Sequence, residues 1–261
     1  MHKTILITGA TDGIGLATAQ QLAADGHHLL LHGRNSDKLA KVAQSLVSQT
    51  QVESYIADFS RIEEVDTLAQ SIKARHEDLD VLINNAGILK TRETITKDGL
   101  DVRFVVNTIS PYNLTRKLLP LIGKEGRVIN LSSAAQSPVD LRAFVGSHRL
   151  DDMSAYAQSK LALTMWSRHL ALAHPMGPVF VAVNPASLLA SKMVKESFGV
   201  AGNDLSIGAD ILVRAALSDE FSDASGKYYD NDAKRFAELH PDATNPQKID
   251  QLIQAIESIT S

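Results

Sequence analysis

Tyr156 and Lys160 place a phenol and an ammonium four residues apart. On a helix, side chains at this spacing lie one turn apart on the same face. An ammonium held there stabilises the phenolate and lowers the phenol pKa from its usual value of about 10. Such a phenol can exchange a proton with an alcohol or a carbonyl oxygen near neutral pH. A core tyrosine beside a solvated lysine would show the same spacing, so the rest of the chain must decide between the two interpretations.

A glycine-rich segment, Thr8 to Gly15, directly follows the first apolar run and opens a helical pattern. Gly9 permits a tight turn, and Gly13 lets a pyrophosphate approach the backbone. Gly15 allows the helix to pack closely on the strand, and the helix N-terminus offers free N–H groups and a positive dipole end. This placement predicts a dinucleotide phosphate site; a purely structural turn is the alternative.

Short apolar runs rich in β-branched residues alternate along the chain with longer amphipathic segments. This alternation predicts βαβ crossovers and a parallel sheet covered on both faces. We therefore expect an α/β fold: a single domain over residues 1–261 with a doubly wound, Rossmann-type parallel sheet in three α/β/α layers. The predicted strands are Thr4–Thr8, His28–His32, Val52–Ala57, Val81–Asn84, Arg127–Leu131, Val179–Asn184 and Gly226–Tyr229. The predicted helices are Gly13–Asp25, Asp37–Gln49, Ile62–His76, Gly99–Leu119, Met153–His174 and Pro246–Ile259.

Two long connections interrupt this alternation, at residues 134–152 and 186–203. Each follows a predicted strand, so each should emerge at the carboxyl edge of the sheet, where open α/β folds bind ligands. Long connections in compact domains are often binding loops; two ordinary surface loops are the alternative. We expect them to line a mainly apolar substrate pocket together with residues 88–94. The apolar side chains expected there are Leu89, Phe144, Leu189, Met193, Val194 and Phe198.

The composition argues against several classes of protein. The 261 residues are 44% hydrophobic and carry a net charge of −4, with Lys and Arg spread along the chain and no basic stripe for nucleic acid. Cysteine is absent, which excludes disulfides and thiolate metal sites. No apolar run approaches the roughly 20 residues of a membrane span, and Met1 to Lys3 leave no room for a signal peptide before the first strand. We expect a cytoplasmic protein that acts on a small molecule. Metal is not expected, because His148, His169 and His174 lack the spacing of a ligand set.

The glycine loop has the spacing Gly-x-x-x-Gly-x-Gly, and it is followed by Asn84-Asn85-Ala86-Gly87 and by the Tyr-x-x-x-Lys pair. In this combination and order, the motifs resemble those of the classical short-chain dehydrogenases/reductases, over about residues 3–229. The resemblance implies one short-chain dehydrogenase/reductase domain, with its cofactor-binding part at about residues 1–133 and substrate loops within 134–152 and 186–203. It also implies hydride transfer between a nicotinamide cofactor and a carbonyl or alcohol substrate.

The resemblance also assigns roles in the reacting centre. Tyr156 matches the general acid/base, and Lys160 matches the lysine that lowers its pKa and binds the nicotinamide ribose. Ser133, the second serine of the Ser132-Ser133 pair, matches the residue that donates a hydrogen bond to the substrate oxygen. Asn107 matches the asparagine that helps to hold a water near the lysine for proton relay.

The end of the second strand bears on the choice of cofactor. An acidic residue there would bind the ribose hydroxyls of NAD, but Gly33 occupies that position and leaves space for a 2′-phosphate. Arg34 can pair with such a phosphate, although a solvated arginine is the alternative, and Asp12 argues mildly for NAD. We expect NADP(H) in preference to NAD(H). Asp58 matches the family position that contacts adenine. The cofactor-binding residues implied are Gly9, Thr11, Asp12, Gly13, Ile14, Gly15, Arg34, Asp58, Asn85, Ala86, Gly87, Tyr156, Lys160 and Leu188.

Two departures from the family pattern stand out. Ser133 and Tyr156 are 23 positions apart, a length that resembles the retinol-dehydrogenase-like and protochlorophyllide-reductase-like branches. The inserted residues expected near the pocket rim are Phe144, His148 and Arg149. The second departure is Asn184-Pro185-Ala186, where the family usually has Pro-Gly, and alanine is unfavourable if φ must be positive. Leu188 then matches the residue whose backbone meets the nicotinamide carboxamide, and Ser191 is a weaker match for a phosphate contact.

A second function class stays open. The same fold can serve a catalytically silent, dinucleotide-sensing regulatory protein, because fold alone does not determine function. The presence of Asn107, Ser133, Tyr156 and Lys160 together favours the enzyme. A homodimer and a homotetramer are both compatible with the resemblance.

Overall fold

Within residues 2–261, which this computed structural model describes, eight strands form one sheet in the order β3-β2-β1-β4-β5-β6-β7-β8. The side chain of Phe198, expected in the pocket, lies outside the described part. All neighbouring strands from β3 to β7 are parallel, and β8 pairs antiparallel with β7. The strands are β1 (Thr4–Ile7), β2 (His28–Gly33), β3 (Val52–Ile56), β4 (Val81–Asn84), β5 (Arg127–Leu131), β6 (Val179–Asn184), β7 (Tyr228–Asp230) and β8 (Arg235–Ala237).

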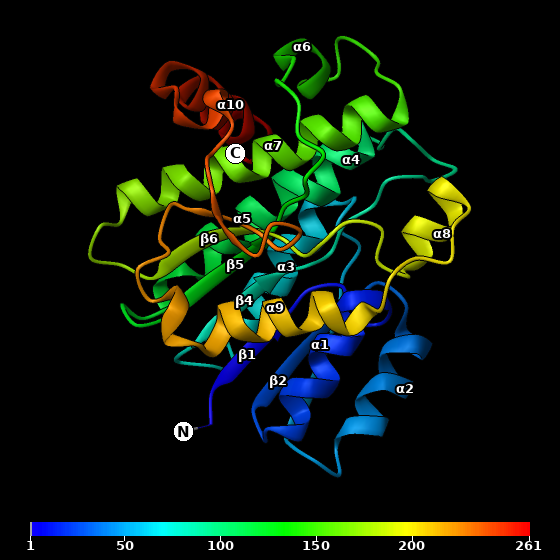
Figure 1. Cartoon of the computed structure of the whole chain (residues 1–261), viewed down its shortest axis with the longest axis vertical. Helices are drawn as coiled ribbons and strands as arrows, with labels where there is room; N and C mark the ends of the chain where they lie inside the picture. Colours follow the sequence, from blue (N-terminus) through cyan, green and yellow to red (C-terminus); the bar gives the residue numbers. More distant parts are fainter. Residues whose placement is uncertain (1) are drawn as a thin grey trace.

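Helices cover both faces of this sheet, as Figure 1 shows. Each face has its own apolar core, and the side chains of the central strands alternate between the two cores. One layer holds α1, α2 and α9, with α9 packed on α1, and the other holds α3, α5 and α7, with α10 packed outside α7. The predicted three-layer, doubly wound α/β fold is confirmed. The helices are α1 (Gly13–Ala24), α2 (Ser36–Leu46), α3 (Ile62–Lys73), α5 (Ser110–Leu118), α7 (Asp152–Ala173), α9 (Leu205–Leu217) and α10 (Pro246–Thr260).

The strand order places the chain reversal between β1 and β4. From β1 the chain moves to β2 and β3 on one side, and then returns to β4 and the later strands on the other. Open α/β sheets bind ligands at the carboxyl ends of the strands beside such a reversal. The glycine loop after β1 and the Asn85–Gly87 segment after β4 both lie there.

The segment predicted as one helix from Gly99 to Leu119 is divided into three. The short α4 (Val102–Phe104) passes into a π-helical turn, η1 (Val105–Ile109), before α5 begins. The π-helical turn ends at Ile109, and Pro111, which has no N–H to donate to the carbonyl of Asn107, lies in the first turn of α5. Such π turns often mark functional positions, and η1 carries Asn107.

The elements outside the predicted ones include α6 (Leu141–Phe144), α8 (Lys192–Phe198), α9, β8 and the short helices η2 (Leu119–Leu121), η3 (Asp219–Phe221) and η4 (Pro241–Thr244). The two long connections contain the short helices α6 and α8. The α9 helix contains Gly208, which interrupts its sequence pattern; a Cβ added at Gly208 would lie 2.6 Å from the Leu189 side chain. The three-residue β8 lacks an apolar run.

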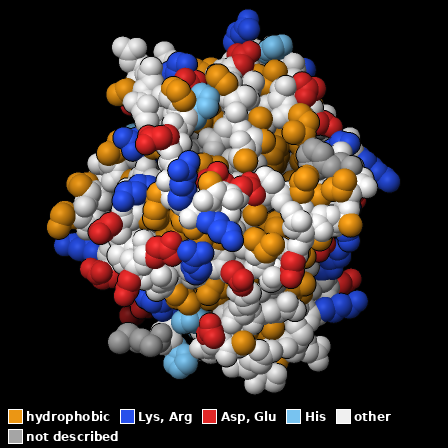
Figure 2. Space-filling model, viewed as in Figure 1, with side chains coloured by type: hydrophobic (Ala, Val, Ile, Leu, Met, Phe, Trp, Pro, Cys, Tyr) orange, Lys and Arg blue, Asp and Glu red, His pale blue; other side chains and the backbone are white. Residues whose placement is uncertain are grey.

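The visible surface mixes charges of both signs. In Figure 2, Lys, Arg, Asp and Glu side chains are interspersed with apolar ones on the face that is drawn, without a single-sign stripe. No helix in residues 2–261 combines the length and the hydropathy that a membrane crossing requires.

Candidate active site

Tyr156 and Lys160 lie one turn apart near the start of α7. Lys160 is buried, and its Nζ donates a hydrogen bond to the Leu131 carbonyl at the end of β5, at 2.7 Å. The same Nζ lies 5.7 Å from the centroid of the Tyr156 ring. The expected shared face is therefore present, and the end of β5 fixes where the cation sits.

The electrostatics of this pair differ from the expectation. Burial raises the pKa of Tyr156, and a hydrogen bond with Ser133 acts in the opposite direction. Burial also lowers the pKa of Lys160 to about 8. The dry environment disfavours the charged forms of both groups, the phenolate and the ammonium. Tyr156 therefore stays protonated near neutral pH, and Lys160 titrates much closer to neutrality than a free lysine.

The two consecutive serines after β5 have different environments. The Ser132 hydroxyl is buried against α7, 2.7 Å from Thr164 Oγ1 and 3.2 Å from the Lys160 carbonyl. The Ser133 hydroxyl instead lies with Tyr156 on the cavity wall and accepts from the Ala135 N–H at 3.1 Å. Because Ser132 is used inside the core, Ser133 is the serine available to a substrate oxygen.

Asn107 connects the segment after β4 to α7. Its Oδ1 accepts from the Ile88 N–H at 2.8 Å, and its Nδ2 donates to the Ile88 carbonyl and to Ser159 Oγ, both at 2.9 Å. A Cβ added at Gly87 would lie 3.4 Å from both Asn107 Oδ1 and Lys160 Nζ. The structure thus brings Asn107 and Lys160 to the same small space beside Gly87.

The loops after β1 and β4 are joined by side-chain bonds. Thr8 Oγ1 accepts from the N–H groups of Asn85 and Ala86, both at 3.0 Å. Asn85 Nδ2 donates back to the carbonyls of Thr8 and Gly9, at 2.8 and 3.1 Å. A Cβ at Gly9, whose φ is +68°, would lie 2.9 Å from Ala86 Cα, and one at Gly15 would lie 2.4 Å from Asn85 Nδ2. Gly9 and Gly15 are therefore required by the close approach of these two loops, before any role toward a phosphate is considered.

Asp12 is the N-cap of α1. Its Oδ1 accepts from the Gly13 N–H at 2.8 Å, so its carboxylate already uses one of the free N–H groups at this helix end. Gly13 has a φ of +55°. Thr11 lies against Gly33, where an added Cβ would be 2.5 Å from Thr11 Cγ2. The close packing of Thr11 therefore accounts for the glycine at position 33, whether or not a phosphate binds there.

Arg34 and Asp58 lie beyond the ends of β2 and β3. Arg34 is exposed and makes no hydrogen bond or ion pair to the described residues. The Asp58 carboxylate accepts from the N–H and hydroxyl of Ser60, at 2.9 and 2.8 Å. Arg34 is therefore free to pair with an anion, whereas Asp58 also stabilises its own turn.

A cavity of about 200 Å³ opens between these elements at the carboxyl edge of the sheet. Ser133 and Tyr156 line it together with Ile14 and Leu188, and its lining residues include none with a charged side chain. A larger hollow of about 540 Å³ between α5, α7 and α10 contains none of the candidate residues. Residues 2–261 hold no cluster of three or more His, Cys, Asp or Glu side chains arranged for a metal ion. The remaining apolar lining of the smaller cavity is Leu89, Ala134, Ala135, Met153, Pro185, Ala186, Leu189, Met193 and Val194.

The expected position of the insertion at the pocket rim is wrong. Phe144 is completely buried and packs on Phe104, with ring centroids 5.0 Å apart. His148 Nδ1 lies 2.9 Å from Asp140 Oδ2, within the insertion itself, and Arg149 donates to a distant backbone carbonyl. The Phe144 ring of α6 turns into the core because its burial is favourable. The cavity lining contains none of Phe144, His148 and Arg149.

Comparison with known proteins places this site in a family. Residues 3–199 match the model of a family described as short chain dehydrogenase. The chain belongs to the short-chain dehydrogenase family. Retinol dehydrogenase 12 of Mus musculus is 30% identical over 250 residues, covering 89% of this chain and 78% of that protein. Human polyprenol dehydrogenase is 32% identical over 186 residues, covering 64% of this chain but only 54% of that protein.

Solved structures agree with this assignment. A protein from Mycobacterium paratuberculosis aligns over 99% of this chain and 93% of its own, with a TM-score of 0.81 and 26% identity. Landomycin C-6 ketoreductase with bound NADP and rabelomycin aligns over 88% and 94%, with a TM-score of 0.69 and 27% identity. The expected short-chain dehydrogenase fold and the likeness to the retinol-dehydrogenase branch are confirmed.

This short-chain dehydrogenase has strained backbone at the cavity wall. Ala186, where the family usually has glycine, has a φ of 118°, and Leu188 has a φ of 53°. Asp232 holds the turn between them: its carboxylate accepts from the Ser187 N–H and hydroxyl at 2.8 and 2.6 Å, and from Asn184 Nδ2 at 3.0 Å. Asp232 has no signal in the sequence, because no local pattern links it to a turn 45 residues earlier.

Replacing Ala186 with glycine is expected to raise the free energy of unfolding by about 1 kcal/mol, because glycine adopts this φ without the strain of a Cβ. Urea titration measures the change. Ala134→Gly is the matched control, because Ala134 lines the same cavity without a positive φ, and it should be destabilising. A loss of stability in both variants would contradict the strain at Ala186.

His32 is a buried residue that sequence analysis also missed. Its Nδ1 accepts from the Gly9 N–H at 3.3 Å, and its Nε2 is 3.0 Å from the Ala57 carbonyl, which requires the neutral ring with the proton on Nε2. The ring stacks on Phe59, with centroids 4.3 Å apart. Burial lowers the pKa of His32 from its usual 6.5 to about 4. The available signal was a histidine inside an otherwise apolar strand.

The neutral His32 makes folding pH-dependent. Between pH 6.5 and 4 the unfolded chain binds a proton at His32 that the folded chain rejects. The free energy of unfolding should therefore fall by up to about 3 kcal/mol as the pH drops through this window, and the contribution is complete above it. Urea titrations of wild type and His32→Gln at several pH values measure the difference. Parallel curves for the two proteins would show that His32 does not titrate as described.

Proposed function

We propose that this short-chain dehydrogenase is an NADP(H)-dependent oxidoreductase that transfers a hydride between nicotinamide and a carbonyl or alcohol substrate, with Tyr156 as general acid/base. The observation that carries the proposal is one apolar cavity lined by Tyr156 and Ser133, with buried Lys160 behind them. The proposed domain spans residues 1–261, with cofactor binding by about residues 1–133 and substrate loops within 134–152 and 186–203. We place the enzyme in the cytoplasm.

The residues present fit a dinucleotide cofactor. Gly87 leaves a space bounded by Asn107 and Lys160 that a Cβ would partly fill. The first turn of α1 has N–H groups that no helix carbonyl accepts, which suits a pyrophosphate. Bound NADPH would supply the hydride. The residues proposed to hold it are Gly9, Thr11, Asp12, Gly13, Ile14, Gly15, Arg34, Asp58, Asn85, Ala86, Gly87, Tyr156, Lys160 and Leu188.

The chain's own groups suit proton donation to a carbonyl oxygen. Tyr156 is kept protonated by burial, so its hydroxyl can donate a proton to an oxygen that gains negative charge. The Ser133 hydroxyl donates a second hydrogen bond to that oxygen and orients it. Lys160, whose pKa burial lowers to about 8, can supply the proton that restores the phenol after it has protonated the substrate. These groups suit the protonation of a carbonyl oxygen during its reduction, with Asn107 holding a water beside Lys160 for proton relay.

Arg34 supports a preference for NADP(H) over NAD(H). It is exposed beyond the end of β2 and has no ion pair within the described chain, so it can pair with a 2′-phosphate. The landomycin ketoreductase, 27% identical, binds NADP. Asp12 counts less against this preference than its charge suggests, because its carboxylate is bonded to the Gly13 N–H.

The cavity supports a neutral, lipophilic substrate. Its wall is mainly apolar and includes no charged side chain, so a carboxylate or phosphate on the substrate would lose its water without a partner. Two relatives are named for polyprenol and retinol, which are lipophilic alcohols. Their names alone do not assign either compound to this chain.

Oxidation of NADPH and NADH, followed by absorbance against a panel of neutral aldehydes and ketones, tests the proposal. We expect turnover with at least one apolar carbonyl compound and faster turnover with NADPH. Tight NADPH binding without turnover on any member would favour the dinucleotide-sensing regulatory protein instead.

A further inference from the structure

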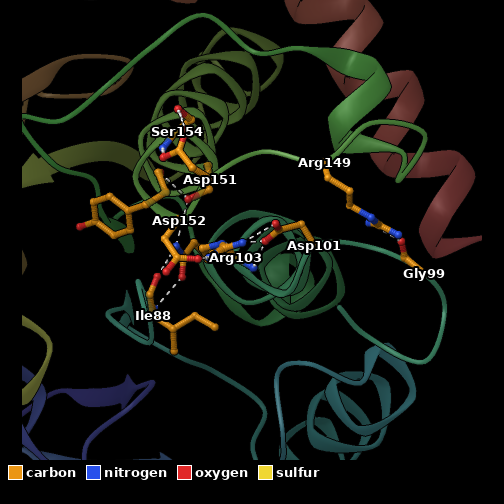
Figure 3. Close-up of polar contacts among 11 residues, drawn as sticks. Ile88, Gly99, Asp101, Arg103, Arg149, Asp151, Asp152 and Ser154 are labelled. Carbon is orange, nitrogen blue, oxygen red and sulfur yellow. Dashed lines mark hydrogen bonds and ion pairs between the residues drawn. The ribbon is translucent and has the colours of Figure 1, made fainter. Parts of the chain in front are cut away.

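The guanidinium of Arg103 is buried between two carboxylates outside the cavity. Figure 3 shows it between Asp101 and Asp152. Arg103 Nε and Nη2 donate to the two oxygens of Asp101 at 2.8 and 2.6 Å, while Nη1 donates to Asp152 Oδ1. The Arg103 side chain is only 2% exposed, and that of Asp152 is 41% exposed.

This ion pair joins the two segments that carry candidate catalytic residues. Arg103 belongs to α4, four residues before Asn107, and Asp152 is the first residue of α7, four residues before Tyr156. A second tie follows further along the same helix, where Asn107 Nδ2 donates to Ser159 Oγ at 2.9 Å. Tyr156 therefore lies between two points at which α7 is fixed to the continuous α4–η1 segment.

The start of α7 needs such a tie because it follows the long insertion. The N-cap, Asp151, accepts from the N–H and hydroxyl of Ser154, so these bonds remain inside the first turn. Local capping stabilises a helix end but does not fix its position relative to the rest of the fold. Within the described residues, the first turn of α7 (residues 152–155) has one polar side-chain contact to another element, the bond from Arg103 to Asp152.

Stability is a poor explanation for this ion pair. Taking charged groups out of water costs several kcal/mol per ion, and apolar residues of similar volume often replace buried ion pairs without loss. The two-point contact with Asp101 instead fixes the orientation of the guanidinium. The remaining nitrogen, Nη1, is thereby aimed at the Asp152 carboxylate.

We propose that Arg103 and Asp152 are positioning residues that hold the first turn of α7, and thereby the Tyr156 hydroxyl, beside Ser133 and Lys160. The inference rests on the proposed role of Tyr156 in proton transfer. A displacement of about 1 Å in a reacting group can cost about 10²-fold in rate, so even modest movement of this turn should be measurable.

The test uses Asp152, because replacing buried Arg103 would leave Asp101 unpaired and could prevent folding. Asp152→Ala should lower kcat at least about tenfold, with the KM for the carbonyl substrate and the Kd for NADPH little changed. Asp152→Asn keeps an oxygen that can accept from Arg103 and should stay within about threefold of wild type. Glu63→Ala is the matched control. It removes the exposed ion pair between Glu63 of α3 and Lys97, which lies in the segment preceding Arg103, and it should leave kcat unchanged.

Hydrogen exchange gives a readout that does not depend on turnover. In the cofactor-free protein, amides of residues 152–159 should exchange faster in Asp152→Ala than in wild type, Asp152→Asn or Glu63→Ala. Unchanged exchange and unchanged kcat in Asp152→Ala would overturn the positioning role, as would equal losses of kcat in the Ala and Asn variants. If the protein reduces no carbonyl compound at all, the exchange result still decides the inference, and only the proposed function fails.

Discussion

Replacing Tyr156 with phenylalanine is expected to lower kcat for carbonyl reduction about 10³-fold, the usual size of a general acid contribution. Phenylalanine keeps the ring whose centroid lies 5.7 Å from Lys160 Nζ and removes only the hydroxyl on the cavity wall that also carries Ser133. The cavity and the glycine loop stay intact, so the Kd for NADPH should change by less than about threefold. The loss should therefore appear in kcat rather than in cofactor binding.

Steady-state kinetics on the best carbonyl substrate of the panel measures this effect. Tyr55→Phe is the control, because it removes a phenol hydroxyl that bonds Glu53 at 2.9 Å, outside the cavity. That variant should keep the wild-type kcat. If Tyr156→Phe also keeps it, Tyr156 is not the general acid/base.

Replacing Arg34 with glutamate is expected to lower the ratio of kcat/KM for NADPH to that for NADH by about 10²-fold, because a charge-assisted hydrogen bond is lost and repulsion replaces it. Arg34 has no partner among the described residues, so its replacement breaks no internal contact. The free energy of unfolding should stay within about 0.5 kcal/mol of wild type, as for most surface changes.

The ratio is measured by varying each cofactor at a saturating carbonyl concentration. Arg235→Glu is the matched charge reversal, because Arg235 is exposed in β8, has no ion pair among the described residues and lies outside the cavity lining, and it should leave the ratio unchanged. An unchanged ratio in Arg34→Glu would mean that Arg34 does not bind the 2′-phosphate of NADPH. Any preference between the two cofactors would then need an origin other than Arg34.

Features encoded by local patterns were predictable from the sequence. The bounds of β4, β5 and β6 match the apolar runs, because buried parallel strands are continuous hydrophobic segments. The glycine loop and the helix carrying Tyr156 were predictable for the same reason: their spacing is itself the signal.

Features that depend on long-range contacts could not be read in this way. Phe144 belongs to the core because Phe104 lies beside it, and nothing in the insertion itself indicates that neighbour. The roles of His32 and Asp232 likewise come from partners far away in the sequence. Burial also reversed the expected direction of the pKa of Tyr156, because desolvation depends on the packed structure rather than on the spacing to Lys160.

The most direct test of carbonyl reduction by this chain is a single-turnover measurement. Wild type and Tyr156→Phe are each saturated with NADPH, their Kd values are measured on the same samples, and the best carbonyl substrate of the panel is then mixed in. We predict similar Kd values, stoichiometric conversion of NADPH and carbonyl to alcohol in wild type, and conversion about 10³-fold slower in Tyr156→Phe. Equal rates in the two proteins, or tight NADPH binding without conversion in wild type, would contradict hydride transfer with Tyr156 as the acid.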